Sequence, residues 1–68
     1  MLQMLEVVGT SPVGFGEAVQ SGVAEIARAG HAAHFFQVVE QRGSIRDGRI
    51  GEDQVVLKVA VEKNFVPA

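Results

Sequence analysis

The stretch that decides the fold is residues 35–61, FFQVVEQRGSIRDGRIGEDQVVLKVAV. Two runs typical of β-strands, 35–45 and 50–61, flank the four residues RDGR at 46–49. Asp-Gly between such runs predicts a two-residue type I′ hairpin turn, because both central residues of that turn need a positive φ angle. Arg46 is then expected to face Arg49, which fixes the pairing of every later residue.

This register sorts the side chains of the hairpin onto two faces, since neighbours along a strand point to opposite sides of a sheet. One face is expected to be mostly apolar, with Arg42 paired to Asp53 at its edge. The other face is expected to be mixed in character, yet too apolar to remain in water. The apolar face holds Phe36, Val38, Glu40 and Arg42 opposite Val59, Leu57, Val55 and Asp53, and the mixed face holds Phe35, Gln37, Val39 and Gln41 opposite Ala60, Lys58, Val56 and Gln54.

The segment before the hairpin predicts an amphipathic helix. Ser11 is a favourable N-cap, Pro12 suits the first helical position, and Gly30 ends a run of apolar residues at helical spacing. Residues 2–8 predict one further strand. The order strand, helix, strand, strand indicates an α+β fold with a three-stranded antiparallel sheet. One helix of about 18 residues, roughly 27 Å long, covers one face of that sheet and leaves the other for another molecule.

Length and composition favour a single small domain, residues 1–68, that self-associates. A chain of 68 residues buries only about 60% of its unfolded surface, and such chains usually need disulfides, a metal or assembly for robust stability. Cysteine is absent, so assembly is the route that we expect. The net charge of −2, the short apolar runs and the lack of a signal-peptide pattern predict a cytoplasmic protein without a membrane partner. Residues 64–68 read as a tail.

No pattern predicts catalytic, metal-binding or nucleic-acid-binding chemistry. Gly9 and Gly14 have the spacing of a phosphate loop, but Phe15 stands where that loop needs a lysine. His31 and His34 are expected in the turn after the helix without a third ligand, so solvated or capping histidines are favoured over a metal pair. No nucleophile and base can be paired from their spacing, and six basic residues against eight acidic ones form no phosphate-tracking stripe. We therefore expect neither an enzyme nor a nucleic-acid binder.

The sequence resembles the dodecin family along nearly its whole length. The resemblance rests on LEVVGTS at 5–11, FFQVVEQRG at 35–43 and QVVLKV at 54–59, with an alanine-rich helix between the first two. It implies a β-α-β-β subunit whose sheet wraps one helix, and a hollow homododecamer of twelve copies. It also implies a non-catalytic flavin store, because dodecins hold FMN or riboflavin as stacked pairs between tryptophans of neighbouring subunits. Such stacking quenches the excited flavin and limits its photochemistry.

Three residues are candidates for the flavin site that the resemblance implies. Phe35 stands at the family's tryptophan position, and Gln54 matches a glutamine that hydrogen-bonds the edge of the isoalloxazine ring. Arg42 matches an arginine that touches the FMN phosphate in some bacterial members, whereas Glu62 stands where those members carry a second basic residue, which puts phosphate recognition in doubt. Phenylalanine offers less stacking area than tryptophan and no N–H donor, so we expect flavin binding weakened by roughly one to two powers of ten.

Alternatives stay open for these residues and for the function. Phe35 could be an interface aromatic without a ligand, and Gln54 could be a polar strand residue paired with Gln41. The leading hypothesis is an oligomeric protein that sequesters flavin; the alternative is a dodecin-shaped assembly whose flavin site has lapsed, and which holds another small molecule or is purely structural. A flavin-dependent catalyst would need an acid–base group beside Phe35, and none is recognisable. On a regular ladder Phe35 and Gln54 lie roughly 20 Å apart, so a shared flavin would need two subunits.

Overall fold

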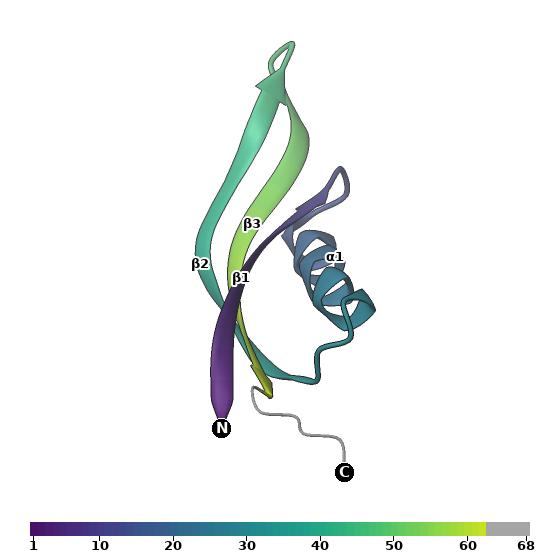
Figure 1. The fold of residues 1–68 in the computed structure, drawn as a ribbon. Helices are drawn as coiled ribbons and strands as arrows, with labels where there is room; N and C mark the ends of the chain where they lie inside the picture. The colour runs from purple at the N-terminus through teal and green to yellow at the C-terminus, as the bar shows by residue number, and fades with distance from the viewer. Residues whose placement is uncertain (63–68) are drawn as a thin grey trace.

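The computed structural model describes residues 1–62, which form three strands and one helix (Figure 1). Along the chain these elements are β1 (Leu2–Ser11), α1 (Phe15–Arg28), β2 (Ala33–Arg46) and β3 (Arg49–Glu62). The predicted β-α-β-β order is confirmed. The tail expected at 64–68 lies outside the described residues. Within residues 1–62, no helix has the length and apolar character needed to cross a membrane.

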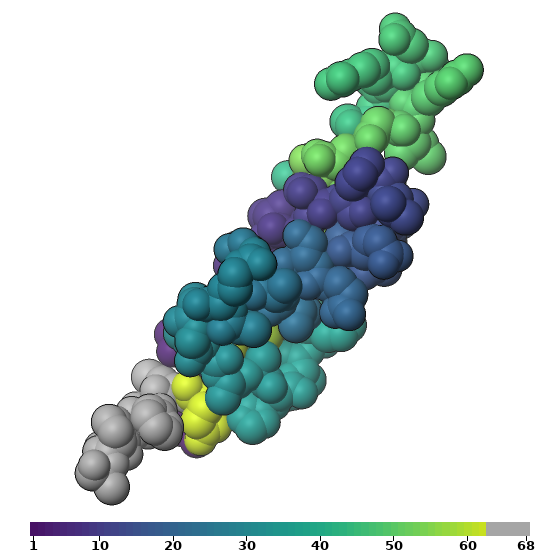
Figure 2. Space-filling model, turned by 90° about the vertical axis from the view of Figure 1, so that its right-hand side faces the viewer, coloured from purple at the N-terminus to yellow at the C-terminus, as the bar shows by residue number. Residues whose placement is uncertain are grey.

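The three strands form one antiparallel sheet with β3 in the centre, in the order β1-β3-β2. The helix α1 lies along one side of this sheet, mainly against β1 and β3, so that the edge strand β2 has little helical cover (Figure 1). The hairpin of β2 and β3 continues beyond β1 and α1. Its tip forms one end of an elongated molecule with extents of 54 × 19 × 13 Å (Figure 2). The predicted α+β architecture is therefore confirmed.

Asp47 and Gly48 form the predicted hairpin turn. Their φ angles are both positive, 54° and 75°, as the central residues of a type I′ turn require. Arg46 faces Arg49 and Ile45 faces Ile50, as expected. The register next to the turn is thus confirmed.

The hydrophobic core lies between α1 and the central strand. Alternate side chains of β3 point toward the helix and are almost fully buried, because side chains alternate between the two faces of a sheet. The buried residues of α1 recur at helical spacing, which confirms the predicted amphipathic helix. The core consists of Val55, Leu57, Val59 and Val61 of β3 with Ala18 and Ile26 of α1, and Leu5, Val7, Val19 and Val23 pack against it.

The helix begins later than the sequence predicted. The expectation that Ser11 and Pro12 start the helix is wrong, since Ser11 is the last residue of β1 and α1 begins at Phe15 after the N-cap residue Gly14. The physical reason is a local hydrogen bond, in which the backbone N–H of Val13 donates to Oγ of Ser11 over 3.0 Å. This bond holds a turn between strand and helix, and β1 is correspondingly longer than the strand predicted from the sequence.

The helix ends where the sequence predicted. Gly30 has a positive φ angle of 89°, a conformation that glycine adopts readily because it has no Cβ atom. Its N–H donates to the carbonyl oxygen of Ala27 over 3.0 Å, and the N–H of His31 donates to the carbonyl oxygen of Ile26 over 3.3 Å. These two bonds form a Schellman motif, which satisfies carbonyl groups of the last helical turn.

The closest approach of α1 to the sheet occurs at two glycines, Gly9 of β1 and Gly22 of α1. A Cβ atom on Gly9 would collide with the carbonyl oxygen of Ala18 and would lie 2.9 Å from the backbone nitrogen of Gly22. A Cβ atom on Gly22 would lie 2.8 Å from Cδ1 of Leu57 and 3.6 Å from the Cα atom of Gly9. Backbone therefore packs directly on backbone at this crossing, and a side chain at Gly9 would push the helix off the sheet.

Gly9→Ala is expected to lower the free energy of unfolding by about 1–3 kcal/mol or more, because the added methyl group meets rigid backbone rather than a flexible side chain. Urea unfolding followed by circular dichroism measures the change. Gly16→Ala is the matched control, since a Cβ atom at that helical position has no atom within 4 Å. Alanine there should raise the free energy of unfolding by about 0.5–1 kcal/mol through its higher helix propensity. Equal stability of the two variants would contradict close packing at Gly9.

Candidate functional site

The face of the sheet turned away from α1 carries the three residues that the sequence singled out. Gln54 and Ala60 of β3 alternate with the buried core residues, so both point away from the helix. Arg42 faces Gln54, and Phe35 faces Ala60. We call this surface the open face. Its members include Phe35, Gln37, Glu40 and Arg42 of β2, Glu52, Gln54, Val56, Lys58, Ala60 and Glu62 of β3, and Met4, Glu6, Val8 and Thr10 of β1.

Arg42 reaches the open face because the ladder of β2 and β3 shifts its register on both sides of this residue, between Val38 and Glu40 and between Ser44 and Ile45. One bulge leaves Val39 of β2 without a partner residue, and the other leaves Gly51 of β3 without one. Each extra residue shifts the pairing by one position, and a shift of one position moves a side chain to the opposite face. The prediction that Arg42 faces Asp53 on the apolar face is therefore wrong, since Arg42 faces Gln54.

The guanidinium of Arg42 holds the side-chain amide of Gln54. Nε of Arg42 donates to Oε1 of Gln54 over 2.8 Å, and one Nη donates to Oε2 of Glu40 over 3.4 Å. Nε2 of Gln54 in turn donates to Oε1 of Glu52 over 3.5 Å. Because a guanidinium can only donate, it must meet the amide oxygen of Gln54, which leaves the amide N–H groups on the side of Glu52. The alternative in which Gln54 pairs with Gln41 is wrong, because Gln41 belongs to the helix side of β2.

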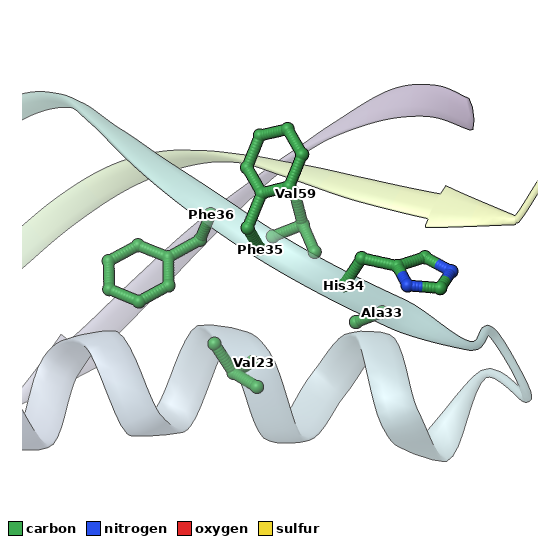
Figure 3. Close-up of a pocket in the computed structure, with 6 residues that line it drawn as sticks. All are labelled: Val23, Ala33, His34, Phe35, Phe36 and Val59. Atoms are coloured by element: carbon green, nitrogen blue, oxygen red, sulfur yellow. The ribbon is translucent and has the colours of Figure 1, made fainter.

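Phe35 presents its ring on the open face. The residue is 56% exposed, and its ring points away from α1, whereas the ring of Phe36 points toward the helix (Figure 3). Its cross-strand partner is Ala60, whose small side chain is fully buried. The pairing expected for Phe35 is confirmed, and the ring is accessible in a single chain to a flat ligand or to a neighbouring molecule.

Phe35 and Gln54 are too far apart to contact one small ligand within a single chain. Phe35 faces Ala60, which lies six residues along β3 from Gln54, or roughly 20 Å at the usual rise of a strand. A ligand that met both the ring and the amide would therefore need two copies of the chain.

Two hollows on the surface of residues 1–62 are both small. One, of about 140 Å³, lies between α1 and β2 (Figure 3), and the other, of about 240 Å³, lies beside the hairpin tip next to Phe15. Sites that enclose drug-sized ligands usually measure about 300–1,000 Å³, so neither hollow would enclose a flavin by itself. The hollow of Figure 3 is lined by Val23, Ala33, His34, Phe35, Phe36 and Val59.

The two histidines lie in different surroundings. His31 follows α1 in the connection to β2, as predicted, whereas His34 belongs to β2 rather than to the expected turn. Nε2 of His34 lies 3.3 Å from Oε2 of Glu62, and the amino group of Met1 lies 3.6 Å from Oε1 of the same carboxylate. These contacts join the ends of all three strands. Among residues 1–62, no three His, Cys, Asp or Glu side chains gather in a way that could hold a metal ion.

The fold and the sequence both match proteins of known family. The family model of the dodecins matches residues 1–63. The chain belongs to the dodecin family. A dodecin of Thermus thermophilus is 38% identical to it over 55 residues, which are 81% of this chain and 80% of that protein.

Solved dodecin structures share the β-α-β-β fold. The dodecin from Streptomyces davaonensis has a TM-score of 0.90 at 34% identity, with 96% of each chain covered. The dodecin from Streptomyces coelicolor has a TM-score of 0.90 at 33% identity, with 97% of this chain and 94% of that chain covered. A variant of the Thermus thermophilus dodecin in which phenylalanine replaces a tryptophan has a TM-score of 0.88 at 34% identity, with 96% of this chain and 97% of that chain covered.

Two carboxylates beside the candidate residues of this dodecin escaped the sequence analysis. Glu40 and Glu52 contact Arg42 and Gln54 respectively, yet the predicted register placed Glu40 on the apolar face. The bulge at Val39 moves Glu40 to the open face. The charge of Glu40 could have revealed this placement in the sequence, because burying an unpaired carboxylate between sheet and helix would be strongly unfavourable. The polar end of the open face therefore holds an arginine and an amide between two acids.

Proposed function

We propose that this dodecin assembles into a hollow dodecamer that binds flavin on its open face, sequesters it and does not turn it over. The observation that carries the proposal is the placement of an exposed aromatic ring, Phe35, and a hydrogen-bonding amide, Gln54, on a sheet face without helical cover. A flat surface for stacking and a donor or acceptor for the polar ring edge are what an isoalloxazine ring requires. The residues present therefore fit a flavin held between copies of the chain.

Phe35 is the stacking platform in this proposal. Stacking of a base on an aromatic side chain contributes about 1–3 kcal/mol per base, and we expect phenylalanine to supply less than tryptophan. The solved Thermus thermophilus variant, in which phenylalanine replaces a tryptophan, has a TM-score of 0.88 to this chain, which supports phenylalanine as compatible with a dodecin fold. When bound, the flavin supplies a light-absorbing ring, and stacking would limit its photochemistry.

Self-association supplies the second half of the site and covers exposed apolar surface. Every residue of β2 is exposed in the single chain, including its apolar side chains. At the hairpin tip Ile45 and Ile50 face each other and are 79% and 74% exposed. Contiguous apolar surface on a small protein usually marks an interaction site. Assembly would also let Phe35 of one chain and Gln54 of another serve the same ligand.

Replacing the ring of Phe35 tests the flavin site. Phe35→Trp should tighten riboflavin by roughly tenfold or more and deepen the quenching of its fluorescence, because indole offers a larger stacking surface. Phe35→Ala should weaken both. Titration of riboflavin with protein, followed by flavin fluorescence, measures the affinities.

Phe36→Trp is the matched control for this series, because Phe36 is the neighbouring aromatic residue and its ring points to the helix side of the sheet (Figure 3). It should leave the titration unchanged. Equal affinities in the wild type, Phe35→Trp and Phe35→Ala would leave Phe35 as an interface residue and favour the lapsed-site alternative.

Light scattering at micromolar protein is expected to give a mass near twelve times the 7.2 kDa of one chain. Ile50→Glu should lower that mass, because it places a charge in apolar surface that is 74% exposed in one chain and contributes little to the fold of that chain. Gln20→Glu, which adds the same charge to an exposed position of α1, is the control and should keep the mass. A stable wild-type monomer would refute the assembly.

A further inference from the structure

On the described part of the open face, carboxylate side chains outnumber Lys and Arg side chains, which bears on the kind of flavin that this face takes. Two of these acids, Glu40 and Glu52, stand beside the candidate residues Arg42 and Gln54. A phosphate ester carries about 1.5 to 2 negative charges near neutral pH, so each acid on this face opposes its approach. The carboxylates of the open face are Glu6, Glu40, Glu52 and Glu62, and its cationic side chains are Arg42 and Lys58, with His34 and the amino terminus beside Glu62.

The guanidinium of Arg42 already donates to two protein groups. A guanidinium grips a carboxylate or a phosphate with two parallel N–H groups, either Nε with one Nη or the two Nη together. Nε donates to Gln54 over 2.8 Å, which takes one N–H of the first edge, and one Nη donates to Glu40 over 3.4 Å. Two protein groups thus compete with a phosphate for Arg42, and Glu40 offsets its charge.

At the other end of the open face, too, a carboxylate stands beside the candidate flavin site. Glu62 follows Ala60, the partner of Phe35, by two residues on β3, and its two oxygens meet His34 and the amino group of Met1. A carboxylate thus stands near the stacking platform, and both of its oxygens already contact groups of the chain. Within residues 1–62, Arg42 at one end of the face and the amino group of Met1 at the other each lie beside a carboxylate.

We propose that the site selects a neutral flavin of the riboflavin class over its 5′-phosphate FMN, and that Arg42 acts as a positioning residue that orients the amide of Gln54. This inference rests on the proposed binding of flavin. It departs from the role in phosphate contact that the family resemblance implied for Arg42. The cause is the set of acids that this chain places around the arginine.

Parallel titrations with riboflavin and FMN test the selection. At low salt, riboflavin should bind roughly threefold more tightly than FMN or better, because like charges about 10 Å apart still repel there. The ratio of the two affinities should fall toward one as salt rises from about 0.02 M to about 0.5 M, since salt screens exposed charges. Quenching of flavin fluorescence follows both ligands in the same buffer.

Glu40→Gln isolates the carboxylate beside Arg42, because it removes one charge and keeps an acceptor. It should narrow the ratio of riboflavin to FMN affinity by roughly twofold or more at low salt. Glu17→Gln, which makes the same charge change in the first turn of α1, should leave the ratio unchanged.

The outcomes separate this inference from the proposed function. FMN bound as tightly as riboflavin, or more tightly, at low salt would overturn the selection of a neutral flavin and leave flavin binding intact. A preference for riboflavin that responds neither to salt nor to Glu40→Gln would overturn it as well. Failure of both flavins to bind would overturn the proposed function and this inference together.

Discussion

The fold depends on the direct packing of backbone on backbone where α1 crosses β1. Gly9 and Gly22 have no side chains to hold the two elements apart, and Leu57 of the central strand fills the space beside them. The helix has only 14 residues, and this contact commits it to β1 and β3. The edge strand β2 therefore has little helical cover, and the opposite face of the sheet has none (Figure 1). One close approach between glycines thus decides which surface a ligand or a second copy of the chain can reach.

The turn chemistry made part of this structure predictable. Asp47 and Gly48 both adopt positive φ angles, and few residue pairs do so readily, so the register beside the turn could be predicted from two letters. The two bulges leave no such signal, since Val39 suits a paired strand as well as an unpaired position and a single Gly51 is compatible with many local structures. The extra residue on β3 shifts the register in one direction, and the extra residue on β2 shifts it back. The pairing predicted for Phe35, which lies beyond both bulges, is therefore right, whereas that for Arg42, which lies between them, is wrong.

The candidate site was predictable to the same extent. Phe35 and Gln54 share a face because each is the direct sequence neighbour of a residue that points toward the helix. This alternation of side chains along a strand can be recognised in the sequence. The contact between Arg42 and Gln54 was not readable, because it requires the extra residues Val39 and Gly51, which change the face and the partner of Arg42 from those predicted. The helix start shows a similar limit: Ser11 has the chemistry of an N-cap, yet its hydroxyl accepts from Val13 two residues on. Local hydrogen-bond competition of this kind is settled by geometry rather than by residue type.

The bulge at Val39 also has a consequence for how copies of the chain can meet. Within residues 1–62, β2 has a strand on one side only, and a long flat edge of this kind tends to recruit another strand and grow into fibres. The bulge twists that edge and breaks the even spacing of its backbone donors and acceptors. Charged side chains at Glu40 and Arg42 follow immediately along the strand. These features disfavour the addition of a strand from another copy to the edge of the sheet. Association through side chains can then give a closed assembly rather than a fibre.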